Sequence, residues 1–172
     1  DLAREKVITT VSSLLALMGL EADPIQSREH ILLSTLLQEQ WNRGEDADLA
    51  GLIRAIQDPP VSKVGVLDVD TFYPPKDRTA LALRINNLIA SPGFQSWLEG
   101  VPLDVGRLLY SDSGRPRVAV LSIAHLSDTE RMFFVSLLLN ELIGWMRARP
   151  GTSSLRALLY MDEVFGFMPP LG

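Results

Sequence analysis

The sequence predicts an α-rich chain of mixed α+β class, with a helical part in residues 1–100 and a strand–helix–strand segment within residues 101–172. Apolar residues recur at helical spacing through most of the first hundred residues. Two nearly continuous apolar runs follow, at 117–124 and 155–161, and they flank a segment with a helical period. Two such runs joined by a long helix are typical of a right-handed βαβ crossover in a parallel sheet.

Four helices are expected in the first part, each with its apolar residues on one face. They span residues 1–19, 23–44, about 46 or 48 to 57, and 77–90. Gly19 is a C-cap, and Asp23 is an N-cap followed by a proline at the first helical position. Residues 64–69 form either a short strand or an extended linker, and residues 94–99 add a helical turn or two.

The second part begins near residue 104 with a change of pattern. Residues 107–110 and 117–124 are expected to be two strands around a turn at 111–116. Ser127 and Glu130 then form a capping box, which predicts a helix from there to about residue 149. Residues 155–161 are the second buried strand.

Composition limits the classes of function. The 172 residues suffice for a sizeable core, and 47% hydrophobic with 22% charged residues is ordinary for a globular protein. The net charge is −5 and no basic block occurs, so these residues lack the positive patch that nucleic-acid binding requires. The absence of cysteine excludes disulfides and thiolate metal sites. We see neither a signal peptide nor an apolar run that could span a membrane, and we expect a cytoplasmic protein.

The main candidate site is Asp162 with Glu163, directly after the apolar run Leu158–Met161. Charged groups beside a dry core are costly, so a carboxylate pair at the end of a buried strand indicates a function. In P-loop nucleotide hydrolases this pattern is the Walker B motif. Asp162 would hold Mg²⁺, usually through a coordinated water, and Glu163 would activate the hydrolytic water. The alternative is an ordinary strand end whose acidic residues cap the next turn.

The phosphate-gripping loop of such enzymes, G-x-x-x-x-G-K-[ST], is absent from the sequence. Its lysines are Lys6, Lys63 and Lys76, and none follows a glycine. Either the acidic pair is not a nucleotide motif, or the loop lies outside these residues. Because the chain starts at Asp and stops shortly after Glu163, we expect it to be a fragment of a longer protein. Without the phosphate-gripping loop, we expect this fragment alone to be inactive.

Other candidates have plainer explanations. His125 lies between a strand end and a helix N-cap, where a loop histidine is favoured over a residue near a nucleotide or subunit. Residues 165–170, rich in aromatics and proline, form either a packed connection to a following helix or a flexible loop that contacts a partner or a nucleotide. His30 is expected to be a structural histidine, and two distant histidines without cysteine make no zinc site. Ser12, Ser13 and Ser34 have no sequence context of a nucleophile.

Residues 117–128, the helix at 130–147 and residues 158–164 resemble the HerA/FtsK-like P-loop ATPases, in particular HerA-helicase-like bacterial ATP-binding proteins. The resemblance implies a partial RecA-like core in residues 101–172 and makes residues 1–100 a helical insertion between Walker A and Walker B. It implies ATP and Mg²⁺ as ligands of the full-length protein, with Asp162 and Glu163 as the matching pair. It also implies a ring, often a hexamer, that acts on DNA or a related polymer as a translocase or helicase-like motor.

Two further expectations depend on the same segments. If the strands at 117–124 and 155–161 lack parallel neighbours, their open edges favour dimerisation or strand exchange. The alternative function, from a different class, is a non-catalytic α-helical interaction module that only happens to end in an acidic strand. A metal-dependent hydrolase built on Asp162 and Glu163 alone is disfavoured, because two carboxylates without further ligands make a poor catalytic site.

Overall fold

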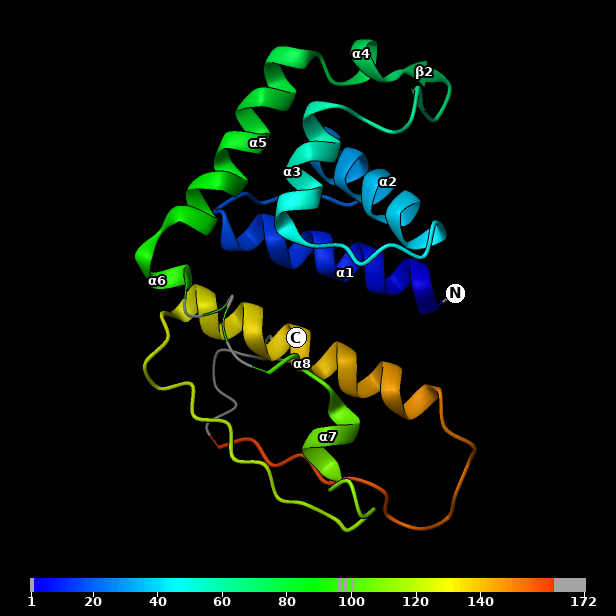
Figure 1. Ribbon diagram of the computed structural model, residues 1–172, viewed down its shortest axis with the longest axis vertical. Helices are drawn as coiled ribbons and strands as arrows, with labels where there is room; N and C mark the ends of the chain where they lie inside the picture. The colour runs from blue at the N-terminus through cyan, green and yellow to red at the C-terminus, as the bar shows by residue number, and fades with distance from the viewer. Residues whose placement is uncertain (1, 96, 98, 100, 163–172) are drawn as a thin grey trace, which may run out of the picture. The chain divides into compact units, whose positions relative to one another are not determined.

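The computed structural model describes residues 2–95, 97, 99 and 101–162, and the chain divides into two compact units, Asp1–Val101 and Pro102–Gly172 (Figure 1). Its described part is mainly helical with one two-stranded sheet, which confirms the α-rich class. None of its described helices combines the length and apolar content needed to cross a membrane.

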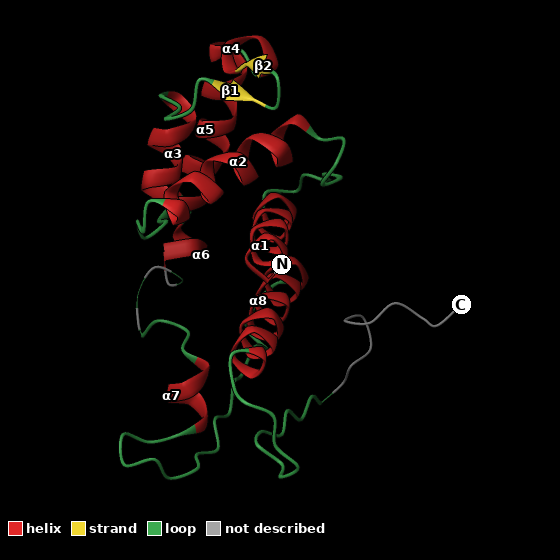
Figure 2. Cartoon of the chain, turned by 90° about the vertical axis from the view of Figure 1, so that its right-hand side faces the viewer, coloured by secondary structure: helices red, strands yellow, loops and turns green. Residues whose placement is uncertain are grey.

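The first unit consists of helices and a small hairpin. Its helices are α1 (Leu2–Leu17), α2 (Arg28–Asn42), α3 (Leu49–Gln57), α4 (Val69–Phe72), α5 (Pro75–Ala90) and α6 (Pro92–Gln95). The strands β1 (Lys63–Val64) and β2 (Leu67–Asp68) pair antiparallel around Gly65, which has a φ of 62° (Figure 2). Residues 64–69 are therefore not an extended linker, because short strands on either side of the turn pair in a two-stranded sheet and Val69 already begins α4.

The four longer helices of this unit enclose its hydrophobic core. Figure 1 shows α3 between α2 and α5, and α1 packs against α2. Several leucines and isoleucines are fully buried: Leu15, Leu32, Leu33, Leu36, Ile56 and Ile85. Since each such side chain contributes about 1.5–3 kcal/mol when fully removed from water, these contacts dominate the stability of the unit.

Caps fix where the helices begin and end. Gly19, with a φ of 72°, follows α1 as predicted. The predicted start of the second helix at Asp23 is wrong, because the carboxylate of Asp23 accepts from the amides of Ile25 and Gln26 and closes a separate turn. Ser27 instead caps α2, accepting from the amide of His30 at 3.2 Å. Asp48 caps α3 in the same way through the amide of Gly51.

The second unit contains α7 (Val105–Leu109) and α8 (Asp128–Arg147). The capping box before α8 is confirmed: the Glu130 carboxylate accepts from the amide of Ser127 at 2.8 Å, and Ser127 Oγ accepts from the amide of Glu130. The strand predicted at 107–110 is wrong, because Asp104 accepts from the amide of Arg107 and starts a helix there. A single bridge between Tyr110 and Pro116 closes the predicted turn.

The strands predicted at 117–124 and 155–161 are not formed in the described part of the second unit, where Figure 2 draws loop on both sides of α8. Val118 and Leu155 are 93% and 82% exposed. A parallel strand needs ladder partners and cover on both faces, and the described residues of this unit provide neither. The helix of the strand–helix–strand prediction is therefore confirmed, while its strands are not.

Candidate functional site

Asp162, the predicted magnesium ligand, lies exposed at the end of the extended segment that begins near residue 155. Within the described residues its carboxylate makes no hydrogen bond or ion pair, and no group of three metal-ligating side chains occurs. Glu163 and the loop at 165–170 lie outside the described residues. The structure therefore places one member of the acidic pair and leaves the metal and nucleotide roles as predictions.

The turn before α8 holds the other predicted group of the second unit. His125 is exposed in this turn, which the amide of Leu126 closes by donating to the carbonyl of Ile123 at 3.1 Å. The first turn of α8 carries the carboxylates of Asp128 and Glu130. These negative charges oppose an anion at the helix N-terminus, where Ser127 already caps one amide. His125 therefore fits the loop histidine better than a residue of a phosphate site.

His30 is buried between α1 and α2 with 1% of its surface exposed. Ser12 Oγ on α1 lies 2.9 Å from Nε2, and Ser34 Oγ on α2 lies 3.2 Å from Nδ1. A nucleophile–base pair needs a free hydroxyl, a third group that orients the base, and access for a substrate. Here both ring nitrogens are occupied by serines inside a helix contact, so the prediction of a structural histidine is confirmed.

Tyr73 links the start of α5 to the start of α2. Its hydroxyl donates to the Glu29 carboxylate at 3.2 Å, and the Arg28 guanidinium lies 5.3 Å from the ring centroid. Burial, together with the negative charge of Glu29, raises the pKa of Tyr73 to about 12. Burial also opposes ionisation of Glu29, but hydrogen bonds from its own amide, Ser27 and Tyr73 outweigh it and lower its pKa.

Arg78 on α5 is a buried charged residue of this unit, with 7% of its surface exposed. Its Nη1 donates to Asp70 at 2.7 Å and to the carbonyl of Tyr73 at 3.0 Å. Asp70 itself is mostly exposed, so the ion pair reaches from the interior to the surface. These bonds hold α4 against α5.

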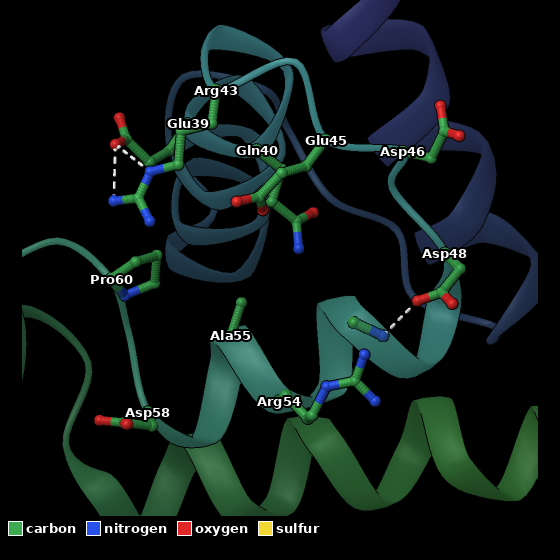
Figure 3. A pocket seen from close by; sticks show the side chains of 11 residues that line it. Glu39, Gln40, Arg43, Glu45, Asp46, Asp48, Arg54, Ala55, Asp58 and Pro60 are labelled. Atoms are coloured by element: carbon green, nitrogen blue, oxygen red, sulfur yellow. Dashed lines mark hydrogen bonds and ion pairs between the residues drawn. The ribbon is translucent and has the colours of Figure 1, made fainter.

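A pocket of about 350 Å³ lies between the end of α2, the following loop and α3 (Figure 3). Gln40, Gly51 and Ala55 line it together with charged side chains, namely Glu39, Arg43, Glu45, Asp46, Asp48, Arg54 and Asp58. Gln40 Oε1 is buried and accepts no hydrogen bond from a described residue, and such an orphaned acceptor costs about 1–3 kcal/mol. This pocket was not predicted from the sequence, although the acidic residues 45, 46 and 48 between two helices were a visible signal.

Comparison of the chain with protein-family models, with curated proteins and with solved structures finds no match. The described residues offer two places for a function. One is the acidic end of the second unit at Asp162, and the other is the charged pocket of the first unit.

Proposed function

We propose that the chain is the Walker B portion of a P-loop ATPase of the HerA/FtsK-like type, with a helical insertion in residues 1–100 and a RecA-like segment in residues 101–172. Asp162 holds Mg²⁺ through a coordinated water, and Glu163 orients the water that attacks the terminal phosphate of ATP. The observation that carries this proposal is the order of the second unit: an exposed apolar segment, the capped helix α8, and a second exposed apolar segment that leads into Asp162.

The exposed segments favour a larger sheet as their normal environment. Val118, Val120, Leu155 and Leu158 are between 79% and 93% exposed. Burying four such side chains is worth about 6–12 kcal/mol, which equals the net stability of a whole domain. A soluble chain gains this free energy when neighbouring strands pair with both segments and helices cover them.

The length of α8 supports the same arrangement. Its 20 residues correspond to about 30 Å at a rise of 1.5 Å per residue. A seven-residue strand spans about 23 Å. The helix can therefore return the chain to the starting edge of a parallel neighbour, as a βαβ crossover requires.

Phosphoryl transfer depends on positioned charges, so the acidic pair needs the rest of a nucleotide site. The sequence contains no G-x-x-x-x-G-K-[ST] loop. The proposal therefore requires that this loop, the polar sensor and any arginine finger come from residues outside these 172 or from a neighbouring subunit. It places ATP and Mg²⁺ in the complete protein, which acts as a ring, as a hexamer in many HerA/FtsK-like ATPases, on DNA or a related polymer.

The test begins with the reading frame that encodes this chain, translated and expressed at its full length. We expect it to encode the phosphate loop before residue 1 and to hydrolyse Mg-ATP. Glu163→Gln lowers turnover at least about 100-fold, the range expected for loss of a positioned base, while the matched Glu21→Gln variant retains full activity. Absence of the loop, or unchanged turnover of Glu163→Gln, overturns the assignment.

A second candidate is a non-catalytic helical interaction module. It is favoured by the first unit, whose described core residues all lie between Val7 and Ile89. Such a module needs no nucleotide. A reading frame without the phosphate loop, with a protein that binds a partner and lacks ATPase activity, would favour this alternative.

A further inference from the structure

The pocket beside α3 has an unbalanced charge. Five carboxylates and two guanidiniums line it, which leaves three uncompensated negative charges. Arg43 is already bound to Glu39 at 2.9 Å and is not available to the others. The side chains of Glu45, Asp46 and Asp58 make no hydrogen bond or ion pair with any described residue. Like charges gathered in one concave place attract a cation.

Gln40 adds a second observation that points to a ligand. It is only 8% exposed, and its Oε1 is buried with no donor among the described residues. Figure 3 shows its amide in the middle of the pocket, between α2 and α3. A ligand that brings an N–H group would satisfy this acceptor, whereas an anion or an apolar group would leave it without a partner.

The floor opposite Gln40 is made of small residues. Gly51 and Ala55 lie there on α3, and a Cβ added to Gly51 would meet Asp48 Oδ1 at 2.7 Å and Gln40 Nε2 at 3.6 Å. The volume of about 350 Å³ lies at the small end of the range for ligand pockets. The volume leaves room for a small ligand such as a slender aliphatic chain.

The geometry points to a binding site for an alkylammonium ligand, with its N–H groups donating to Gln40 Oε1 and its positive charges near Glu45, Asp46 and Asp58, which line separate sides of the pocket (Figure 3). A bare metal ion fits less well, because no group of three metal-ligating side chains converges in the described part of the chain. An alkylammonium group occurs on free polyamines and on lysine side chains of peptides. Three uncompensated charges match a triamine such as spermidine or a short run of lysines.

The site is independent of nucleotide hydrolysis, so it is tested on the 172-residue chain without ATP. Spermidine and, separately, the peptide trilysine are titrated into ¹⁵N-labelled protein at low salt. We expect amide shifts confined to residues 40–58, and binding that weakens strongly with added salt because part of the attraction is screened. The stronger of the two probes identifies the source of the ammonium group.

Three variants separate this site from general attraction to an acidic protein. The triple change Glu45→Gln, Asp46→Asn and Asp58→Asn weakens binding at least tenfold, and Gln40→Leu weakens it about fivefold. Arg54→Ala strengthens it, because Arg54 is a like charge in the pocket wall. The matched control Gln38→Leu, whose amide donates to Asn42 on the same helix, leaves binding unchanged.

Gln40→Glu tests the same position with a gain of affinity, because a carboxylate in place of the amide tightens binding to an ammonium group. Misfolding could explain a loss of affinity in Gln40→Leu, but it could not explain this gain. Circular dichroism checks that each variant keeps its helix content. Shifts scattered over all acidic surfaces would overturn the proposal. Equal affinity of the wild type, Gln40→Leu and Gln40→Glu, or no shift at millimolar spermidine, would overturn it as well.

Discussion

Replacing Ser12 by alanine tests the buried link between α1 and α2. Ser12 Oγ lies 2.9 Å from His30 Nε2, and the imidazole is 1% exposed. Alanine leaves this ring nitrogen buried without a partner, which costs about 1–3 kcal/mol. Alanine also favours a helix by about 0.5 kcal/mol relative to serine. We therefore expect the free energy of unfolding to fall by about 0.5–2.5 kcal/mol.

Urea titration followed by helical circular dichroism measures this change. For a unit of about 100 residues, each 1 kcal/mol corresponds to a fall of about 4–8 °C in Tm. Ser13→Ala is the matched control, because Ser13 lies on the same helix, is half-buried and has no hydrogen bond to a described residue beyond its helical backbone. It should be neutral or stabilise the chain slightly.

A double-mutant cycle makes the test sharper. With His30→Leu, the polar partner is gone, so Ser12→Ala should change stability little or increase it. Equal stabilities of the Ser12→Ala and Ser13→Ala variants in the wild-type background would refute the argument. So would an undiminished cost of Ser12→Ala in the His30→Leu background.

Three further perturbations test other parts of the structure. Because folding raises the pKa of Tyr73 from 10.0 to about 12, the contribution of this residue to the free energy of unfolding is fully present below pH 10. Stability falls as the pH rises from 10 to about 12. Because the pKa of Glu29 is lowered from 4.5, its contribution is present above pH 4.5 and is lost as the pH falls through the folded-state value. Tyr73→Phe removes this alkaline loss of stability and costs about 1 kcal/mol near pH 7. Urea denaturation at several pH values measures both effects, and equal stabilities of the wild type and Tyr73→Phe at every pH would contradict the expectation. Ser127→Ala removes a cap of α8 and costs about 1 kcal/mol, with faster amide exchange in the first turn of α8 and no change in α2 as internal control. The double change Val118→Thr and Val120→Thr alters the unfolding free energy of this chain by less than about 0.5 kcal/mol, because both side chains are exposed. It reduces self-association in analytical ultracentrifugation. A large loss of stability would show that these residues are packed.

Local signals predicted much of the helical structure. The apolar spacing of residues 7–18, Gly19 at the end of α1, Asp48 before α3 and the box at Ser127 and Glu130 all depend on neighbours within four residues. Such contacts can be read from a sequence directly. The misplaced start of α2 had a local cause as well, because Asp23 and Ser27 are both good caps and only one of them precedes the amphipathic run.

Contacts between distant residues could not be predicted in the same way. The partners of His30 lie on two helices, 18 residues before it and four after it, and nothing in the sequence links Ser12 to this ring. The pocket likewise combines the end of α2 with α3 around Gln40. The apolar segments at 117–124 and 155–161, before and after α8 in the sequence, differ from these examples. Their local pattern predicts strands, but a strand forms only where other strands are present to pair with it.

The hydrogen bonds of His30 also set the axial position of α1 against α2. Leucine rows alone allow one helix to slide along another by a turn of about 5.4 Å, because each leucine then meets an equivalent neighbour. Such a slide would carry Ser12 away from Nε2 and leave the imidazole facing apolar side chains. A single buried polar contact can therefore select one register among several of similar apolar burial, and it does so with a ring that Ser34 already holds in place.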